Sequence, residues 1–267
     1  MTWVIGAPTM FGYSIALADI QVTLTYPDKS KKYLDAIQKL FPIGKFVVAG
    51  FSGDVEIGYL LMEDLRRWFF LPEKERAWIP DCLVMDWKRR ARFIYSKIPP
   101  KRQCAVELLF VAVYPQKNNG IPGEAQTFAC KMKSPLFEPA KIDPGKVISI
   151  GSGNNVAEYR RTIDQLATGY NSLMQMEVNN PGGYGLAITI NTSINVKNNP
   201  EKGLSSHFHT AEVRRGKISF GTNDHSGFDA EGSEVKFKMP EVATNWTEFK
   251  EKMKQQGIAL ADVQAIA

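Results

Sequence analysis

Residues 45–70 read KFVVAGFSGDVEIGYLLMEDLRRWFF, and the spacing of the apolar side chains changes within this stretch. Residues 45–51 are rich in β-branched and aromatic side chains, which is typical of a buried strand. From Asp54 to Phe70 the apolar residues recur at helical spacing, and Ser52-Gly53-Asp54 can cap the N-terminus of a helix. The stretch therefore predicts a strand that leads directly into a helix.

The flanking segments add further strands and helices. Strands are expected at residues 2–6, 12–18, 105–114, about 126–132 and 147–150. Helices are expected at about 80–98 and at about 154–177, the second one opened by Gly151-Ser152-Gly153. Residues 26–38 start with a polar, turn-rich run, so we expect a loop that can carry a short helical turn.

The last third of the chain is less regular. Residues 184–196 fit a helix and a strand equally well, and residues 207–213 and 217–220 predict a hairpin. A strand at 235–239 and a helix at about 246–264 are expected to follow. A polar boundary near 222–233 divides a main domain, 1–222, from a C-terminal extension, 223–267.

The order of these elements predicts the fold class. Strands, two helices, strands, one or two helices and strands follow one another, which disfavours an alternating parallel βαβ sheet. The order fits an α+β fold in which two antiparallel sheets pack face to face and helices cover the outside. A chain of 267 residues with 44% hydrophobic residues is long enough to bury such a core.

Composition limits the compartment and the partners. No apolar run approaches the roughly 18 residues that a membrane-spanning helix needs, and the start MTWVIGAPTM lacks the basic region of a secretory signal. The three cysteines are too scattered for a disulfide framework or a CxxC-type zinc site. We therefore expect a cytoplasmic protein without a membrane partner.

The formal net charge of +5 is mild for this length. It comes from local clusters, which more often form solvated helix faces than nucleic-acid sites. The clusters are Lys29/Lys31/Lys32, Arg66/Arg67, Lys88/Arg89/Arg90/Arg92 and Arg160/Arg161. His207-x-His209 with Asp224 or His225 is a conceivable zinc site, but strand histidines are more often surface or core residues. No metal, cofactor or nucleic acid is expected.

Thr2 is the first candidate for chemistry. A threonine hydroxyl needs a nearby base, and the α-amino group of an N-terminal threonine can supply one. Threonine is small enough for removal of the initiator Met1 to be expected. Many proteins begin with Met-Thr, so the surrounding motifs decide whether this residue matters.

Four segments follow Thr2 in a recognisable order: ADIQVTL at 18–24, KLFPI at 39–43, VVAGFSGD at 47–54 and VISIGSG at 147–153. Together they resemble the proteasome β subunits and the related bacterial ring proteases of the HslV type. The resemblance covers residues 2–70 and 145–165 best. It implies the fold of the N-terminal nucleophile hydrolases, a four-layer sandwich of helix, sheet, sheet and helix.

The resemblance also implies roles for single residues. Thr2 matches the nucleophile, Lys39 the catalytic lysine, and Asp19 the acid that pairs with it. Gly50 matches the glycine whose N–H faces the developing oxyanion, and Ser152 the serine near the threonine amine. Thr23 matches the residue whose backbone pairs with a substrate strand, and Val22, Phe41, Val48 and Ser52 surround the expected specificity pocket.

Two assignments stay open at this stage. The Lys39 match requires a gap, and an ungapped alignment places Asp35 or Ala36 at the lysine position. The late acidic residue of the family and its serine partner have no clear counterpart. Ser205 or Ser206 can supply the serine, and Glu201 is the nearest acid before them.

The expected function is hydrolysis of peptide or amide bonds by Thr2, inside a ring of identical subunits that encloses the active sites. Peptides or unfolded proteins are the implied substrates, and an ATPase regulator remains open. The aromatic end of the helix at Trp68, Phe69 and Phe70 suits either a subunit contact or packing on its own sheet. The alternatives are a catalytically silent ring subunit and a hydrolase of small amides that is not a peptidase.

Overall fold

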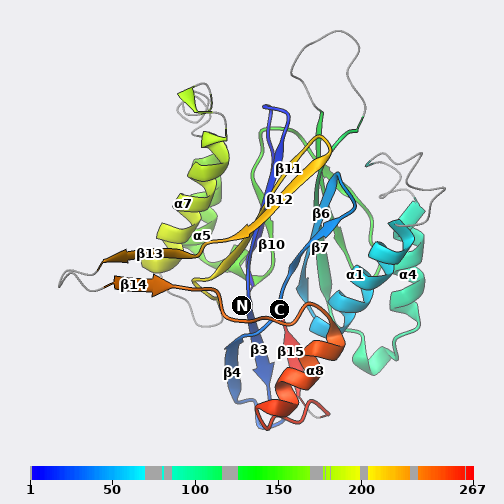
Figure 1. The fold of residues 1–267 in the computed structure, drawn as a ribbon. Helices are drawn as coiled ribbons and strands as arrows, with labels where there is room; N and C mark the ends of the chain where they lie inside the picture. The colour runs from blue at the N-terminus through cyan, green and yellow to red at the C-terminus, as the bar shows by residue number, and fades with distance from the viewer. Residues whose placement is uncertain are drawn as a thin grey trace.

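Two antiparallel sheets of five strands each lie face to face in the centre of the computed structural model (Figure 1). The first sheet comprises, in spatial order, β10 Ile148–Ile150, β1 Val4–Pro8, β2 Ser14–Asp19, β11 Phe208–Arg214 and β12 Lys217–Thr222. The second comprises β5 Leu40–Ile43, β6 Val47–Gly53, β7 Val106–Val113, β8 Thr127–Lys133 and β9 Ala140–Ile142. The structure describes residues 2–69, 80, 86–115, 126–168, 177, 179–180, 182–198, 204–228, 234–261 and 263–267.

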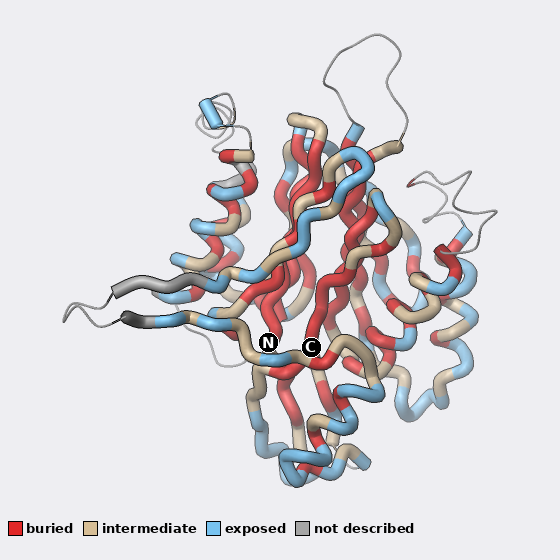
Figure 2. Tube along the Cα trace, in the orientation of Figure 1, coloured by how far each residue is buried: buried red, intermediate tan, exposed pale blue. Residues whose placement is uncertain are grey.

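Small and branched side chains fill the space between the two sheets. The first sheet contributes Val4, Ala16, Ala18, Ile150, Ala211 and Val213, and the second contributes Leu40, Val48, Leu109, Val111, Val113 and Ala129. Successive side chains of a strand point to opposite faces of the sheet. The strand residues that alternate with those just named therefore face the outer helices. Figure 2 shows the result as buried segments along the strands of both sheets.

A layer of helices covers the outer face of each sheet (Figure 1). Helices α5 Ala157–Thr168 and α7 Gly183–Asn198 cover the first sheet, and α1 Val55–Phe69 and α4 Lys88–Ser96 cover the second. Trp3 stacks on Tyr159 of α5 with ring centroids 4.6 Å apart. Short 3₁₀ turns, η2 Pro100–Arg102 and η3 Ser152–Asn155, complete the helical elements. The chain is thus an α+β protein layered as helix, sheet, sheet and helix.

The C-terminal part of the chain adds to this core. A three-stranded sheet lies at one end of the sandwich, in the order β15 Gln264–Ile266, β3 Gln21–Thr25 and β4 Lys31–Asp35. Helix α8 Trp246–Gln255 buries Phe249 and Met253 completely in the cluster that also contains α1. The expected division at 222–233 therefore does not separate an independent appendix, because residues beyond it complete the main core. Strands β13 His225–Phe228 and β14 Glu234–Phe237 form a two-stranded arm that projects from the body (Figure 1).

Several expected elements are confirmed. The strand and helix of the opening stretch are β6 and α1, and the side chain of Asp54 caps α1 by accepting from Ile57 N–H at 3.0 Å. The hairpin of β11 and β12 is present as expected, and the ambiguous residues 184–196 belong to helix α7. In the helix expected at 80–98, α4 forms the second half, and residues 81–85 lie outside the described residues.

Three expectations are wrong. The loop expected at 26–38 contains strand β4, because pairing with β3, as in Val22 with Leu34, overrides the polar composition. No element was expected between the strands at about 126–132 and 147–150, but β9 lies there and pairs with β8. The last helix ends at Gln255 rather than near 264, since Gly257 adopts a φ of 70° and residues 264–266 then form β15. Within the described residues, no helix is both long and apolar enough to cross a membrane.

Candidate active site

Thr2 lies immediately before β1 and is fully buried. Its carbonyl oxygen accepts a hydrogen bond from Gly153 N–H at 2.8 Å, and its own N–H donates to Ser152 Oγ at 3.0 Å. Gly151 has a φ of 91°, and a Cβ atom built there would lie 2.5 Å from the Thr2 carbonyl oxygen. Only glycine therefore lets the Gly-Ser-Gly turn approach Thr2 closely enough for both contacts.

Lys39 connects Thr2 to Asp19. Its Nζ atom lies 3.2 Å from Thr2 Oγ1 and 2.9 Å from each carboxylate oxygen of Asp19. Asp19 also accepts hydrogen bonds from the backbone N–H groups of Trp3 at 2.9 Å and Gln21 at 3.0 Å. Backbone N–H groups directly before β1 and at the start of β3 thus hold the carboxylate, and the carboxylate orients the lysine toward the threonine. Lys39 is thus in contact with both Thr2 and Asp19, and its match to the catalytic lysine of the family stays a prediction.

The electrostatics of this ion pair follow from its burial, since neither side chain has exposed surface. Burial lowers the pKa of Lys39 below its usual range, while the nearby charges of Asp19 and Asp35 oppose this shift. Desolvation penalises the charged form of an amine, and a contacting carboxylate favours it. Because a buried charge without its partner is strongly unfavourable, each member of the pair depends on the other.

Gly50 does not have the place that its proposed role requires. It lies inside β6, with Leu40 of β5 on one side and Leu109 of β7 on the other. On the β5 side, the N–H of Phe51 donates to the backbone carbonyl oxygen of Lys39. N–H groups alternate between the two sides of a strand, so the N–H of Gly50 faces β7. A Cβ at Gly50 would lie 2.8 Å from Val4 Cγ1, which gives the glycine a role in close sheet packing instead.

The substrate-binding residues expected from the resemblance are not accessible in this structure. Thr23 pairs with Tyr33 of β4 and with Ile266 of β15, so β3 offers no free edge for a substrate strand at this position. Val22 is fully buried in the core, and Ser52 is 2% exposed within β6. The pairing of β15 with β3, which closes this edge at Thr23, was not predicted from the sequence.

The other residues of the expected pocket and subunit contact also belong to the core. Phe41 packs on Phe51 and Tyr59, with ring centroids 6.1 Å away in both cases, and Val48 lies between the sheets. Trp68 and Phe69 are buried against their own sheet, whereas Phe70 lies outside the described residues. Of the two interpretations of this aromatic helix end, intrachain packing fits Trp68 and Phe69.

A second polar cluster next to the first was not predicted. Asp35 Oδ2 accepts a hydrogen bond from Ser205 Oγ at 2.8 Å and lies 3.3 Å from His207 Nδ1. Ser205 thus has an acidic partner. This acid belongs to β4, whereas the sequence pointed to Glu201, shortly before the serine. Because 170 positions separate Asp35 and Ser205, no local pattern predicts their contact. The only hint in the sequence is that one residue is an acid and the other a serine.

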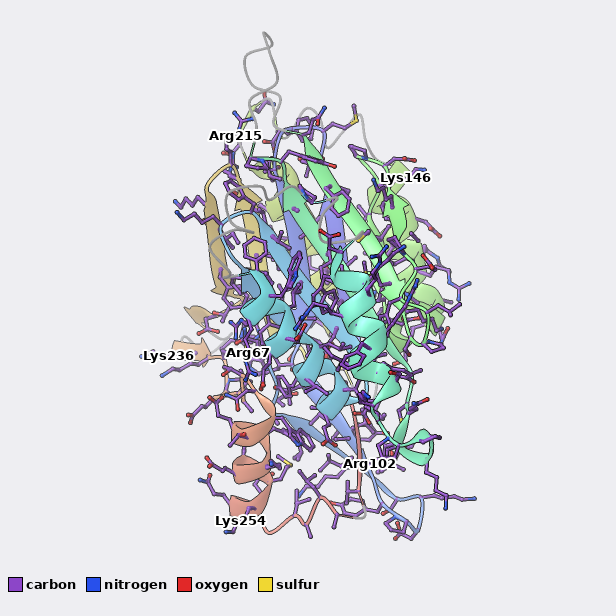
Figure 3. All side chains as sticks on the ribbon, turned by 90° about the vertical axis from the view of Figure 1, so that its right-hand side faces the viewer. Arg67, Arg102, Lys146, Arg215, Lys236 and Lys254 are labelled. Atoms are coloured by element: carbon purple, nitrogen blue, oxygen red, sulfur yellow. The ribbon has the colours of Figure 1, made fainter. Side chains whose placement is uncertain are left out.

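Other candidates for a site among the described residues are the basic side chains and the possible metal ligands. Figure 3 shows the labelled side chains Arg67, Arg102, Lys146, Arg215, Lys236 and Lys254 spread across this view, from the top of the molecule to its bottom. In the basic cluster of α4, Arg90 pairs with Asp64 at 2.5 Å and Lys88 with Glu138 at 3.3 Å. Among the described residues, no group of three or more His, Cys, Asp or Glu side chains is placed to hold a metal ion.

The buried cluster can support nucleophilic chemistry. It combines the Thr2 hydroxyl with a lysine and a carboxylate. The Thr2 nitrogen beside them is a peptide amide while Met1 is attached, and it can act as a base only as a free α-amine. No protein-family model matches the chain, and no curated protein matches it either. The functional assignment therefore depends on the geometry around Thr2.

Proposed function

We propose that this protein is a threonine-type N-terminal nucleophile hydrolase that cleaves peptide or amide bonds, related to the proteasome β subunits and HslV-type proteases. One observation carries the proposal: Lys39 Nζ lies 3.2 Å from Thr2 Oγ1 while paired with the buried Asp19. Ser152 contacts the Thr2 nitrogen at the same time. The layered arrangement of two antiparallel sheets between helices supports the same family and its fold.

The reaction requires that Met1 be removed, so that the Thr2 nitrogen becomes a free α-amine. This amine accepts the proton of Thr2 Oγ1 as the oxygen attacks the amide carbonyl carbon. The C–N bond then breaks, the leaving amine takes the proton, and an ester to Thr2 remains. Water then adds to the ester carbonyl as the amine takes one of its protons. The bond between the acyl carbon and Thr2 Oγ1 breaks, the protonated amine returns the proton to Oγ1, and the carboxylic acid product leaves.

Lys39 and Asp19 adjust the pKa of the Thr2 amine so that it can act as the base. A cation near the amine lowers the pKa of the amine, which keeps it neutral and able to accept a proton near neutral pH. Asp19 offsets the cost of burying the lysine and holds its direction. Ser152 Oγ, at the Thr2 nitrogen, is placed to exchange protons between this nitrogen and water.

Assembly into a ring of identical subunits belongs to the same proposal. Helix α7 supports it, because Leu186, Ile190 and Ile194 are 55%, 46% and 51% exposed and follow one another at intervals of four residues. Side chains with this spacing line one face of a helix. An apolar face of this kind on the outer layer suits a contact with another subunit. Location in the cytoplasm and peptide substrates complete the proposal.

Turnover assays on Thr2 variants test the proposed activity. The wild-type protein and Thr2→Ala and Thr2→Ser variants are incubated with fluorogenic peptides, an unfolded protein and small amides. Hydrolysis by wild type and Thr2→Ser but not by Thr2→Ala is expected, because serine keeps a hydroxyl nucleophile. Equal turnover by Thr2→Ala would rule out Thr2 as the nucleophile, and turnover of small amides alone would identify an amidase rather than a peptidase.

A catalytically silent ring subunit is the second candidate. Three features favour it: Thr2 has no exposed surface, β15 closes the edge of β3, and the Gly50 N–H faces the β6–β7 ladder. In a silent subunit the Lys39–Asp19 pair would serve only to join β2 to the segment before β5. Retention of Met1 on the purified protein together with absent turnover would select this candidate.

A further inference from the structure

Asp35 lies at the centre of a polar cluster that the proposed mechanism does not use. Besides Ser205 and His207, it contacts Gln21, whose Nε2 donates to Asp35 Oδ1 at 3.0 Å. The N–H of His207 donates to Ser205 Oγ at 3.0 Å, and the His207 ring stacks on Phe237 with centroids 4.2 Å apart. Both oxygens of this carboxylate are therefore held by side chains from other strands and loops.

Gln21 joins this cluster to the candidate active site. Its backbone N–H donates to Asp19 Oδ2 at 3.0 Å, while its side chain donates to Asp35. One residue thus orients two carboxylates. The charge of Asp35 also acts on Lys39, since it raises the pKa of Lys39 against the effect of burial. Asp35 is consequently coupled to Lys39 both through contacts and through the electric field.

The cluster contains serine, histidine and aspartate, but its geometry is not that of a second nucleophile. Ser205 Oγ donates to Asp35 Oδ2, and His207 Nδ1 approaches this same oxygen. In a hydrolytic triad the acid and the nucleophile contact opposite ring nitrogens of the histidine. Ser205 is also only 2% exposed. The serine and the histidine therefore fix the position of the Asp35 carboxylate. Asp35 is the residue whose role needs an explanation.

We propose that Asp35 is a positioning residue for Lys39, fastened by Ser205, His207 and Gln21. Its negative charge favours the protonated form of Lys39, together with the charge of Asp19 and against the effect of burial. Through Gln21 it also contacts the residue whose N–H orients Asp19. This inference rests on the proposed hydrolase activity and adds an acidic residue and a serine partner to it. The groups that titrate around Asp35 are His207, in contact with it, and the Lys39–Asp19 pair, while Lys31 and Lys32 of its own strand are exposed.

The test compares Asp35→Asn with Asp28→Asn. Asp28 is a matched control because it lies in the β3–β4 hairpin and accepts from a serine, Ser30 Oγ at 2.6 Å, but is exposed and remote from Lys39. The rate at which a β-lactone acylates Thr2 is measured from about pH 5 to about pH 10. This range includes the ordinary pKa values of histidine and of an α-amine. Loss of a negative charge lowers the pKa of nearby bases.

We expect Asp35→Asn to label about tenfold more slowly than wild type. This is less than the about 100-fold that a group transferring the proton itself contributes, because Asp35 acts through Lys39. Both limbs of its pH profile should move to lower pH, a change that a purely structural role would not produce. Asp28→Asn should match wild type, and Asp35→Glu should recover most of the rate. An Asp35→Asn profile equal to that of Asp28→Asn would overturn the inference and leave the hydrolase proposal standing.

Two outcomes are separated by further measurements. If Asp35→Asn does not fold, Ser205→Ala decides, since it keeps the carboxylate and removes only the hydroxyl that donates to Asp35 and accepts from His207 N–H. It should slow labelling and shift the profile in the same direction but less, and an unchanged profile would contradict the role of the cluster. Absence of labelling in wild type itself would refute the hydrolase proposal, and the inference would fall with it.

Discussion

Lys39 Nζ and Thr2 Oγ1 lie 3.2 Å apart, although 37 positions separate the two residues, and both side chains are fully buried. A lysine is rarely buried to this extent unless a carboxylate accompanies it, as Asp19 does here. In the proposed mechanism, the ion pair acts through its contact with the Thr2 hydroxyl, and it also connects β2 to the segment before β5. The consequences for activity and for stability can be separated by mutation.

Lys39→Met should abolish activity and weaken the fold. Activity should drop by about 100-fold or more, as expected for loss of a group that controls proton transfer. The free energy of unfolding should decrease by about 3–5 kcal/mol, because Asp19 becomes a buried charge without its partner. Turnover assays and urea unfolding measure the two effects.

The double variant Lys39→Met/Asp19→Asn provides the control. It removes both charges, so stability should recover in large part while activity stays lost. A double variant as unstable as Lys39→Met alone would show that packing of the lysine stem, and not the unpaired carboxylate, causes the loss.

Strand β15 should restrict the size of the substrate. The N–H of Ala267 donates to the Gly53 carbonyl at 2.7 Å, and β15 pairs with β3 from Thr23 to Thr25. Ala267→Pro removes this donor and should release the strand. Hydrolysis of extended peptides should then rise several-fold, whereas that of a small amide should hardly change.

Ala261→Pro is the control for this change, because Ala261 lies in the exposed turn before β15. Fluorogenic peptides of increasing length measure the effect. If Ala267→Pro and Ala261→Pro gave the same length dependence as wild type, β15 would not limit access.

The sequence predicted the centre of the molecule better than its ends. The opening stretch gave β6 and α1 because the change of apolar spacing and the Asp54 cap are local signals. Thr2, Asp19, Lys39 and Ser152 were found through the order of four motifs, and the structure brings them together. Motif order therefore predicted which of these residues lie together, whereas their catalytic roles stay a prediction.

What the sequence did not predict depends on contacts between distant segments. Nothing local in residues 264–266 marks a strand, since β15 exists only through its pairing with β3. The pairing of Ser205 with Asp35 likewise joins positions 170 residues apart. The error on Gly50 arose because the motif fixes the residue type, whereas the register of β6 fixes the direction of its N–H.

The exposed face of α7 should carry a contact between subunits. Ile190→Glu places a charge in the middle of the apolar stripe that Leu186 and Ile194 complete. Burying this charge in an interface without a partner is unfavourable, so the assembly should dissociate. Sedimentation velocity measures the change, with Phe93→Glu as control because Phe93 is 62% exposed on α4, on the opposite side of the sandwich. A wild-type monomer, or equal behaviour of both variants, would contradict a ring built through α7.

Stability should fall in mild acid because of His209. Burial lowers the pKa of His209 from 6.5 to about 4, against the weaker opposing charge of Asp224. Nδ1 has no hydrogen-bond partner among the described residues, and the ring stacks on Phe220. Between these two pKa values the unfolded chain binds more protons than the folded one, so stability decreases as the pH falls through this window.

The full effect of this one residue is about 3 kcal/mol, reached near pH 4 and absent above pH 7. The measurement is the difference in unfolding free energy between wild type and His209→Gln at several pH values. This difference should change with pH only in that window, and a constant difference would refute the assignment.

The most direct test of the central claim is the intact mass of the purified protein before and after treatment with a threonine-directed β-lactone. We predict loss of Met1 and then a single covalent adduct that maps to Thr2, with no adduct on the Lys39→Met/Asp19→Asn variant. Retained Met1, or a free Thr2 that never forms the adduct, would contradict the hydrolase proposal and leave a silent subunit of the same fold.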